Sequence, residues 1–327
     1  MIRDAERVRA ALVAALAFAL LAGTTAAFAV SAVLKLERSP VAAPQFTKHF
    51  SPGCDCPSHA AVLSLRLRKA DTIDAGIVDR DGDVVRTLVE NDPRRRGELT
   101  LLWNGRDDAG VVVPDGRYRL RLRLDGAHRT IVVPNPIFVD TEPPSVRLLD
   151  VAPRVFSPDG DGESDAIRAA YTATEPARAS LLVDGAPAMT GKLRRQGRTS
   201  VMWNGAQLDR PLPPGTYDVA LRVTDRAGNV SEPTEAVDVR IRYVEIVARS
   251  LRVPRGGVLR FGVDTDARRF SWSLRGRGRT LSRSGARADE RVAVALPARL
   301  RPGRYVLRAT AAGHSAQVVV RIVRRAR

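Results

Sequence analysis

The sequence predicts an all-β protein in which tandem β-sandwiches follow one N-terminal apolar helix. Three observations support this prediction. Apolar and polar residues alternate over short runs, turn dipeptides separate these runs, and one set of motifs recurs about every hundred residues. The chain has 327 residues, which is enough for two or three domains that each bury a core of their own.

The alternating runs are typical of half-buried strands, because successive side chains of a strand point to opposite faces of a sheet. These runs occupy residues 63–68, 118–124, 217–223, 237–241, 259–263 and 318–322. Turn dipeptides such as Asp81-Gly82 and Asp115-Gly116 lie between them. No long helical period follows Leu36, so we expect strands and turns in the rest of the chain.

Three motifs mark the internal repeat. They are Phe-Ser-Pro at 50–52 and 156–158, Trp-Asn-Gly at 103–105 and 203–205, and a proline-glycine turn before Tyr118 and Tyr217. A third copy lacks the Trp-Asn-Gly turn but keeps such a turn before Tyr305. The three tyrosines lie 99 and 88 residues apart, and a module of this length with several short strands fits an immunoglobulin-like β-sandwich.

The repeat and the proline-rich breaks divide the chain into five segments. We expect an N-terminal signal anchor or transmembrane helix at 1–36 and a linker at 37–44. The three sandwiches then follow at 45–140, 144–243 and 244–327, the last of them a degenerate copy.

The repeated residues have structural roles rather than chemical ones. Trp103 and Trp203 can fill a sandwich centre, and the Asn-Gly behind each makes a tight turn with positive φ. Each tyrosine hydroxyl can fasten the corner where the chain enters a core strand.

The N-terminal segment predicts export. Residues 10–34 form an uncharged run of 25, long enough for a helix that crosses the hydrocarbon core of a bilayer. Arg3, Arg7 and Arg9 precede the run, so the short N-terminus should remain in the cytoplasm. We therefore expect a single-pass protein of the cell membrane whose bulk is extracytoplasmic. Cleavage at Ala27-Phe28-Ala29 would instead release a secreted protein.

The motifs together resemble a known module. Phe-Ser-Pro-Asp-Gly-Asp-Gly-Glu-Ser-Asp at 156–165, the Trp-Asn-Gly turn at 203–205 and Pro-Gly-Thr-Tyr at 214–217 resemble the FlgD-type immunoglobulin-like domain, named after the flagellar hook-cap protein. The resemblance covers 50–124 and 156–223, and it reaches 244–327 only through the Tyr305 turn. Such modules also occur as accessory domains of secreted proteases, so the resemblance implies a spacer or assembly unit.

An acidic loop in the second copy is a candidate calcium site. Asp159, Asp161, Glu163 and Asp165 alternate with glycines and a serine, and hard oxygen ligands spaced in this way can converge on Ca²⁺. Ala170 stands where an EF-hand has its bidentate glutamate, so the site would be irregular. The alternative is a loop whose aspartates bond their own backbone in Asx turns. The first copy has residues 53–59 here and cannot form the same site.

Residues 53–59 of the first copy contain Cys54 and Cys56, the only cysteines of the chain. In an oxidising compartment we expect a Cys-x-Cys disulfide or two free thiols. A zinc cluster with His49 and His59 is the alternative, although its spacing matches no known finger. Lipidation is not expected, because Cys54 lies about twenty residues beyond the apolar run.

The net charge of +17 comes almost entirely from arginine and favours anionic partners. Arg119, Arg121 and Arg123 should share one strand face, and Arg66 and Arg68 another. Anionic wall polymers, lipid headgroups or an envelope protein suit such faces. The alternative is that a GC-rich genome supplies arginine wherever a solvated cation is acceptable.

Other partners and enzymatic activity are not expected. Nucleic acid does not fit an exported chain with so few interleaved aromatics, and nothing indicates a small-molecule substrate. The four histidines lie in no catalytic motif, and no nucleophile-elbow, zinc-protease or P-loop spacing occurs. The sequence thus predicts a non-catalytic structural or interaction protein of the cell envelope. The alternative is an accessory subunit that positions an exported enzyme or surface assembly encoded elsewhere.

Overall fold

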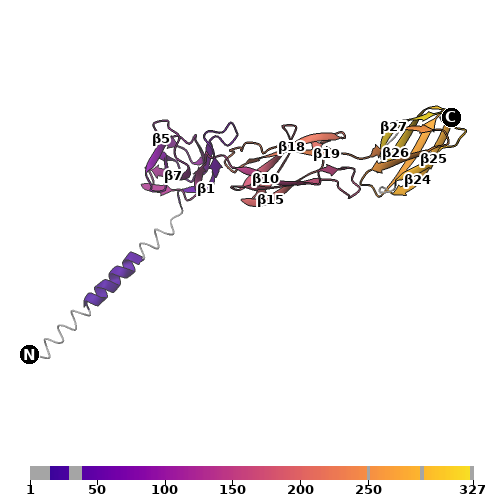
Figure 1. The fold of residues 1–327 in the computed structure, drawn as a ribbon. Coiled ribbons are helices and arrows are strands. Elements are labelled where there is room, and N and C mark those ends of the chain that lie inside the picture. Colours follow the sequence, from indigo (N-terminus) through magenta and orange to yellow (C-terminus); the bar gives the residue numbers. More distant parts are fainter. Residues whose placement is uncertain (1–14, 29–38, 249–250, 288–290, 325–327) are drawn as a thin grey trace, which may run out of the picture. The chain divides into compact units, whose positions relative to one another are not determined.

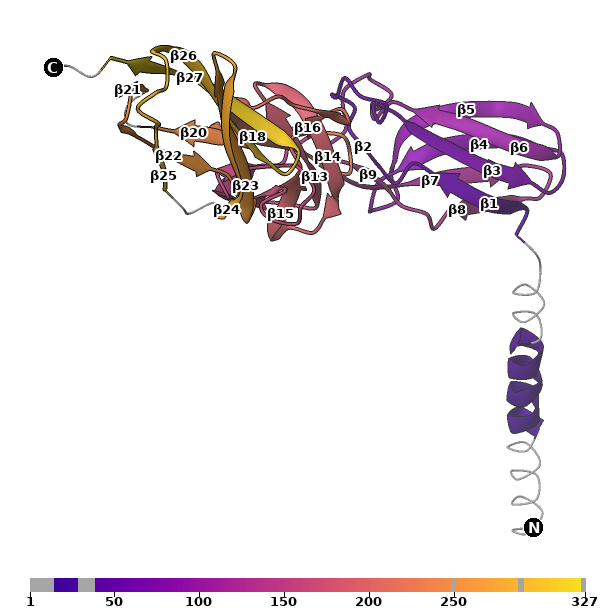
Figure 2. The same ribbon diagram turned by 90° about the vertical axis from the view of Figure 1, so that its right-hand side faces the viewer.

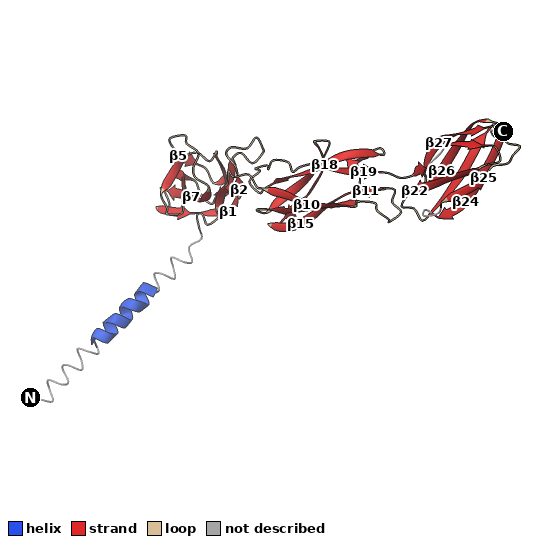
Figure 3. Cartoon of the chain, viewed as in Figure 1, coloured by secondary structure: helices blue, strands red, loops and turns tan. Residues whose placement is uncertain are grey.

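The structure is a computed structural model that describes residues 15–28, 39–248, 251–287 and 291–324. The chain divides into two compact units, Met1–Asp140 (unit 1) and Thr141–Arg327 (unit 2). One helix near the N-terminus is followed by strands and turns, as the colours of Figure 3 show. The predicted all-β class with one N-terminal helix is therefore confirmed.

The described part of the N-terminal helix covers residues 15–28. Its large apolar side chains are exposed, among them Phe18 at 76% and Phe28 at 78%. The hydroxyl groups of Thr24 and Thr25 donate hydrogen bonds to the backbone carbonyls of Leu20 and Leu21, one turn earlier. Among the described residues, no helix is long and apolar enough to cross a membrane, and the expected span 10–34 lies partly outside them.

Unit 1 holds one β-sandwich. Its strands are β1 (Val41–Phe46), β2 (His49–Phe50), β3 (Ala61–Leu67), β4 (Asp71–Val78), β5 (Val84–Arg94), β6 (Gly97–Trp103), β7 (Gly116–Leu124), β8 (Arg129–Val132) and β9 (Ile137–Val139). One sheet has the order β1-β3-β6, and the other has β2-β9-β7-β4-β5 with β8 beside β7 (Figure 2). All pairs are antiparallel except the short edge pair of β2 with β9.

Unit 2 begins with a second sandwich of the same design (Figure 1). Its strands are β10 (Val146–Ala152), β11 (Val155–Phe156), β12 (Ile167–Ala173), β13 (Ala177–Val183), β14 (Ala186–Arg194), β15 (Gly197–Trp203), β16 (Ala206–Gln207), β17 (Arg210–Pro211), β18 (Gly215–Thr224) and β19 (Val237–Ile241). The sheets have the orders β10-β12-β15 and β11-β19-β18-β13-β14, with a small β16-β17 ribbon.

The rest of unit 2 forms a third sandwich. Its strands are β20 (Glu245–Val247), β21 (Arg252–Pro254), β22 (Val258–Asp264), β23 (Arg269–Gly276), β24 (Arg279–Arg287), β25 (Val292–Ala295), β26 (Gly303–Ala311) and β27 (His314–Val323). The orders β20-β22-β25 and β21-β27-β26-β23-β24 repeat those of the other two sandwiches. The third copy therefore keeps the full strand order despite its weak sequence motifs.

Each sandwich has its own apolar core centred on aromatic side chains. Phe50 meets Trp103 with ring centroids 5.4 Å apart, and Phe156 meets Trp203 at 5.6 Å. Both tryptophans are about 1% exposed, as the sequence predicted for core residues. In the third sandwich the core tryptophan comes from another strand: Trp272 on β23 packs edge-on against Phe261 at 5.6 Å.

The tyrosine corners are present in all three sandwiches. The hydroxyl of each tyrosine donates to the carbonyl four residues earlier, namely Tyr118 to Pro114 (2.7 Å), Tyr217 to Pro213 (2.7 Å) and Tyr305 to Arg301 (3.0 Å). This hydrogen bond closes the turn before the core strand, which confirms the role predicted for the repeated tyrosine.

Replacing Trp203 with Ala should lower the free energy of unfolding by about 3–5 kcal/mol, because the change empties an aromatic core site. Urea unfolding of the protein measures this loss. Met202, the preceding residue on β15, is 54% exposed, so Met202→Ala is the matched control and should change the stability by less than about 0.5 kcal/mol. Equal effects of the two changes would contradict the core assignment.

Gly105 should tolerate no side chain. A Cβ added there would lie 2.2 Å from Pro52 Cγ and 3.1 Å from Phe50 Cε2, whereas one added at Gly110 would meet nothing within 4 Å. Both glycines have positive φ, 72° and 81°, so an alanine carries the same backbone cost of about 1–2 kcal/mol at either site. Gly105→Ala should therefore unfold at clearly lower urea concentration than Gly110→Ala. The same urea midpoint for both variants would mean that Phe50 and Pro52 do not pack closely against this turn.

Candidate functional site

The acidic loop of the second sandwich leaves the core directly after β11. Ser157 is 1% exposed, and its amide donates to the carbonyl of Ser164 (3.1 Å), which closes the loop on itself. An added Cβ at Gly205 would lie 3.0 Å from Pro158 and 3.2 Å from Phe156. The Trp-Asn-Gly turn therefore packs against the base of the loop and fixes the position from which its carboxylates project.

Asp165 holds the loop together from within. One of its carboxylate oxygens accepts a hydrogen bond from the Gly160 amide (2.6 Å), and the other accepts one from the Gly162 amide (2.8 Å). Both glycines have positive φ, 80° and 90°, which turns their amides inward. Asp165 thus bonds the backbone of its own loop, as expected for the alternative in which the loop aspartates form Asx turns.

Glu163 forms an ion pair with Arg268 of the third sandwich. Its carboxylate lies 3.3 Å from the Arg268 guanidinium, and both side chains are more than half exposed. An ion pair so exposed contributes little to stability because water screens it.

Asp159 and Asp161 converge on a residue that the sequence did not single out. Their carboxylates and that of Asp266 each offer an oxygen, and the three oxygens lie within 4.8 Å of one another. Asp266 stands in the turn between β22 and β23, in the third sandwich of unit 2. Of the four predicted ligands, the structure therefore brings two together and adds a third from about one hundred residues further along the chain.

The electrostatics of this cluster are unfavourable without a cation. Both carboxylate oxygens of Asp266 are inaccessible to solvent, and neither accepts a hydrogen bond of good geometry. Burial raises the pKa of Asp266, and the negative charges of Asp159 and Asp161 raise it further, while the backbone amide of Asp266 and the nearby Ser157 hydroxyl partly oppose the shift. Burial likewise raises the pKa of the Tyr243 hydroxyl, with a further contribution from the charge of Asp159.

The remaining hydrogen bonds of the loop leave part of the cluster open. Asp159 accepts one hydrogen bond from the Ser157 hydroxyl (3.2 Å) and a long one from the Asp161 amide (3.3 Å). Asp161 accepts one at a single oxygen, from the Glu163 amide (2.8 Å). Each side chain thus keeps lone pairs for another ligand.

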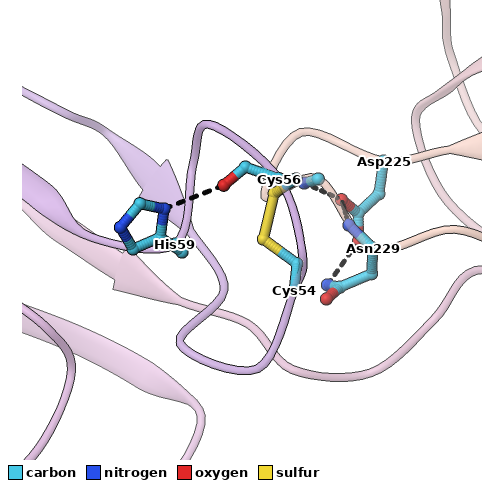
Figure 4. The surroundings of a disulfide bond; sticks show 6 residues. Cys54, Cys56, His59, Asp225 and Asn229 are labelled. Carbon is cyan, nitrogen blue, oxygen red and sulfur yellow. Dashed lines mark hydrogen bonds between the residues drawn. A yellow bond between two sulfur atoms is a disulfide. The ribbon is translucent and has the colours of Figure 1, made fainter.

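The equivalent loop of unit 1 is built differently. Cys54 and Cys56 form a disulfide, and His59 Nδ1 donates to the carbonyl of Cys56 (2.9 Å), as Figure 4 shows. His49 stacks on Phe138 with ring centroids 5.0 Å apart. The disulfide prediction is confirmed, and the zinc alternative is wrong for this state because bonded sulfurs are not thiolate ligands.

A basic row lies on the outer face of the larger sheet of unit 1. Arg119, Arg121 and Arg123 alternate with buried residues along β7, as predicted. Arg123 pairs with Asp125 (3.2 Å) and more loosely with Asp74 (3.8 Å). Within the described residues, Arg119 and Arg121 have no carboxylate at ion-pair distance. Arg66 is exposed on β3 of the other sheet, and Arg68 follows the end of that strand and donates to the Ser39 carbonyl (3.0 Å).

The second sandwich has no such row on its equivalent strand. Tyr217 occupies the corner that Tyr118 occupies in unit 1, so Asp218 and Ala220 stand at the positions of Arg119 and Arg121. Asp218 faces Asp238 across the sheet, and the hydrogen bond between their side chains raises the pKa of Asp218. The second sandwich therefore lacks the basic row of unit 1.

These features define the class of the protein: a tandem array of immunoglobulin-like β-sandwiches with strand-end loops and outer strand faces as its candidate sites. Comparison with known proteins identifies the type of immunoglobulin-like domain. Residues 60–127 match the family model of the FlgD Ig-like domain, so the chain contains a FlgD-type immunoglobulin-like domain in unit 1.

Two curated relatives match part of the chain. The basal-body rod modification proteins FlgD of Salmonella typhimurium and of Salmonella typhi are each 43% identical to this chain over 63 residues, which is 19% of this chain. The matched segment spans only 27% of the length of those relatives. Among solved structures, the fibronectin(III)-like modules of Clostridium thermocellum CbhA match 62% of this chain and 92% of theirs, at 16% identity and a TM-score of 0.33.

Asp165→Ala should destabilise the loop even without calcium, because it removes two hydrogen bonds from backbone amides to a carboxylate. We expect a loss of about 1–3 kcal/mol in the free energy of unfolding, measured in urea with a chelator present. Glu163→Ala is the control and should change the stability by less than about 1 kcal/mol. If Asp165→Ala unfolds like the parent in chelator and differs only when calcium is added, Asp165 is a metal ligand rather than a loop anchor.

Proposed function

We propose that this protein is a non-catalytic structural or interaction protein of the cell envelope, anchored in the membrane by its N-terminal apolar segment and extracytoplasmic over the remainder. The observation that supports this best is the repeated framework itself. Three sandwiches share one strand order, and their repeated aromatic residues serve packing and corner closure. Immunoglobulin-like and FlgD-type domains are structural and interaction modules, in keeping with such a role.

The proposed ligand is an anionic wall polymer, and the proposed contact is the basic row on β7. Arg119 and Arg121 lie side by side on one outer face, with no carboxylate in the described chain to neutralise them. Guanidinium groups bind phosphate and carboxylate through paired hydrogen bonds, which suits such polymers. The absence of this row from the second sandwich argues against genome composition as its whole explanation, because a compositional bias would act on every copy.

A second candidate follows from the relatives. A stretch of 63 residues of this chain is 43% identical to proteins named for basal-body rod modification. This favours an accessory role in which the sandwiches position a surface assembly or an exported enzyme encoded elsewhere. Mild crosslinking in cells separates the two: one abundant protein partner supports the accessory role, whereas retention by purified wall alone supports the polymer-binding role.

Replacing Arg119 and Arg121 together with Gln should weaken retention on isolated cell wall several-fold, because two half-exposed cations are lost from one face. Binding of the parent should also fall steeply between low and moderate salt, since counter-ions screen exposed charges. The matched control is Arg168→Gln with Arg260→Gln, which removes the same charge from two exposed positions on other strands. Retention that is indifferent to salt, or equal for both double variants, would contradict the proposed contact.

A further inference from the structure

We propose that Asp159, Asp161 and Asp266 bind one Ca²⁺ ion that joins the second and third sandwiches of unit 2. The proposal differs from a site confined to the acidic loop, because one ligand comes from the other sandwich. It is also independent of wall binding, since the basic row lies in unit 1.

The geometry of the three carboxylates supports the site. Their ligand oxygens lie within 4.8 Å of one another, a spacing that an ion with oxygen ligands at about 2.3–2.6 Å can bridge. Asp159 and Asp161 are held by a loop that Asp165 and the Trp-Asn-Gly turn fasten in place. The site therefore requires little further ordering of the loop when an ion binds.

The state of Asp266 is an independent indication of a ligand. Its two carboxylate oxygens are shielded from solvent and accept no hydrogen bond of good geometry, although a shielded carboxylate ordinarily has a close partner. Two further carboxylates face it. A carboxylate whose oxygens are shielded from solvent and lie against two other carboxylates is disfavoured by desolvation and repulsion, and a bound cation reduces both penalties.

Nearby arginines do not provide that cation. Arg268, two residues after Asp266, lies against Glu163, and Arg242 pairs with Asp264. Both pairs join the second sandwich to the third, and neither uses a carboxylate of the cluster. They bring the two turns together and leave the three carboxylates facing each other.

Calcium fits this donor set better than its common competitors. Carboxylate oxygens are hard ligands, and the described side chains of the cluster offer neither thiolate nor imidazole for zinc or copper. Calcium accepts an irregular shell completed by water and backbone carbonyls, whereas magnesium requires near-octahedral geometry. An exposed Asp161 beside the half-buried Asp159 and Asp266 gives an irregular, half-open shell of that kind.

Titration of the metal-free full-length protein with calcium chloride, followed by calorimetry, tests the proposal. We expect a dissociation constant of about 10⁻⁴–10⁻³ M, the range of extracellular calcium modules. Asp266→Asn should weaken binding by tenfold or more. Asp209→Asn is the matched control: Asp209 is exposed in the β16–β17 turn at φ 62°, which asparagine tolerates, and its substitution should leave the affinity unchanged.

Thermal unfolding gives a second readout that a purely structural role would not produce. In chelator, Asp266→Asn should melt at the same temperature as the parent or higher, because it relieves repulsion; with calcium, only the parent should gain stability. Asp161→Asn, on an exposed part of the loop, supplies the same binding test should the Asp266 variant not fold. The absence of calcium binding up to about 10 mM, well above the expected range, would overturn the proposal. So would parent-like affinity of Asp266→Asn alongside loss in Asp159→Asn, which would place the ion in the loop alone.

Discussion

The contact between phenylalanine and tryptophan beneath a glycine turn determines where the functional loops of this protein begin. In the first two sandwiches the aromatic pair is buried, and the glycine after Trp-Asn leaves just enough space for the proline of Phe-Ser-Pro. The chain must therefore leave the core at the same point in both. What projects from that point is free to differ: a disulfide-closed loop in unit 1 and an acidic loop in unit 2.

The same separation of framework and chemistry appears on the sheet faces. Tyr118 and Tyr217 close equivalent corners, yet the next outward positions carry arginine in one sandwich and aspartate in the other. Outward residues can vary because water solvates them whatever their charge, whereas the inward residues are constrained by close packing. Function in such an array is to be sought in the differences between copies and at the places where two copies meet.

Sequence reasoning predicted the framework well because its signals are local. Period-two alternation predicts the strands, and the turn before Tyr305 with the alternating run after it predicted a third copy, whose strand order matches that of the other two. The candidate metal site could be predicted from the sequence only in part. Asp266 belongs to no motif and becomes a neighbour of Asp159 only through the packing of unit 2, while Asp165 looks like a ligand in sequence but is occupied by two backbone amides. The missing EF-hand glutamate indicated only that a calcium site in this loop would be irregular.

The central claim is that the fold holds two loop aspartates ready for a third from the next sandwich. Anomalous diffraction from crystals of the protein grown with calcium tests this most directly. The account predicts a single strong peak at about 2.3–2.6 Å from oxygens of Asp159, Asp161 and Asp266. A peak bound by Glu163 and Asp165 without Asp266, or no peak at saturating calcium, would contradict it.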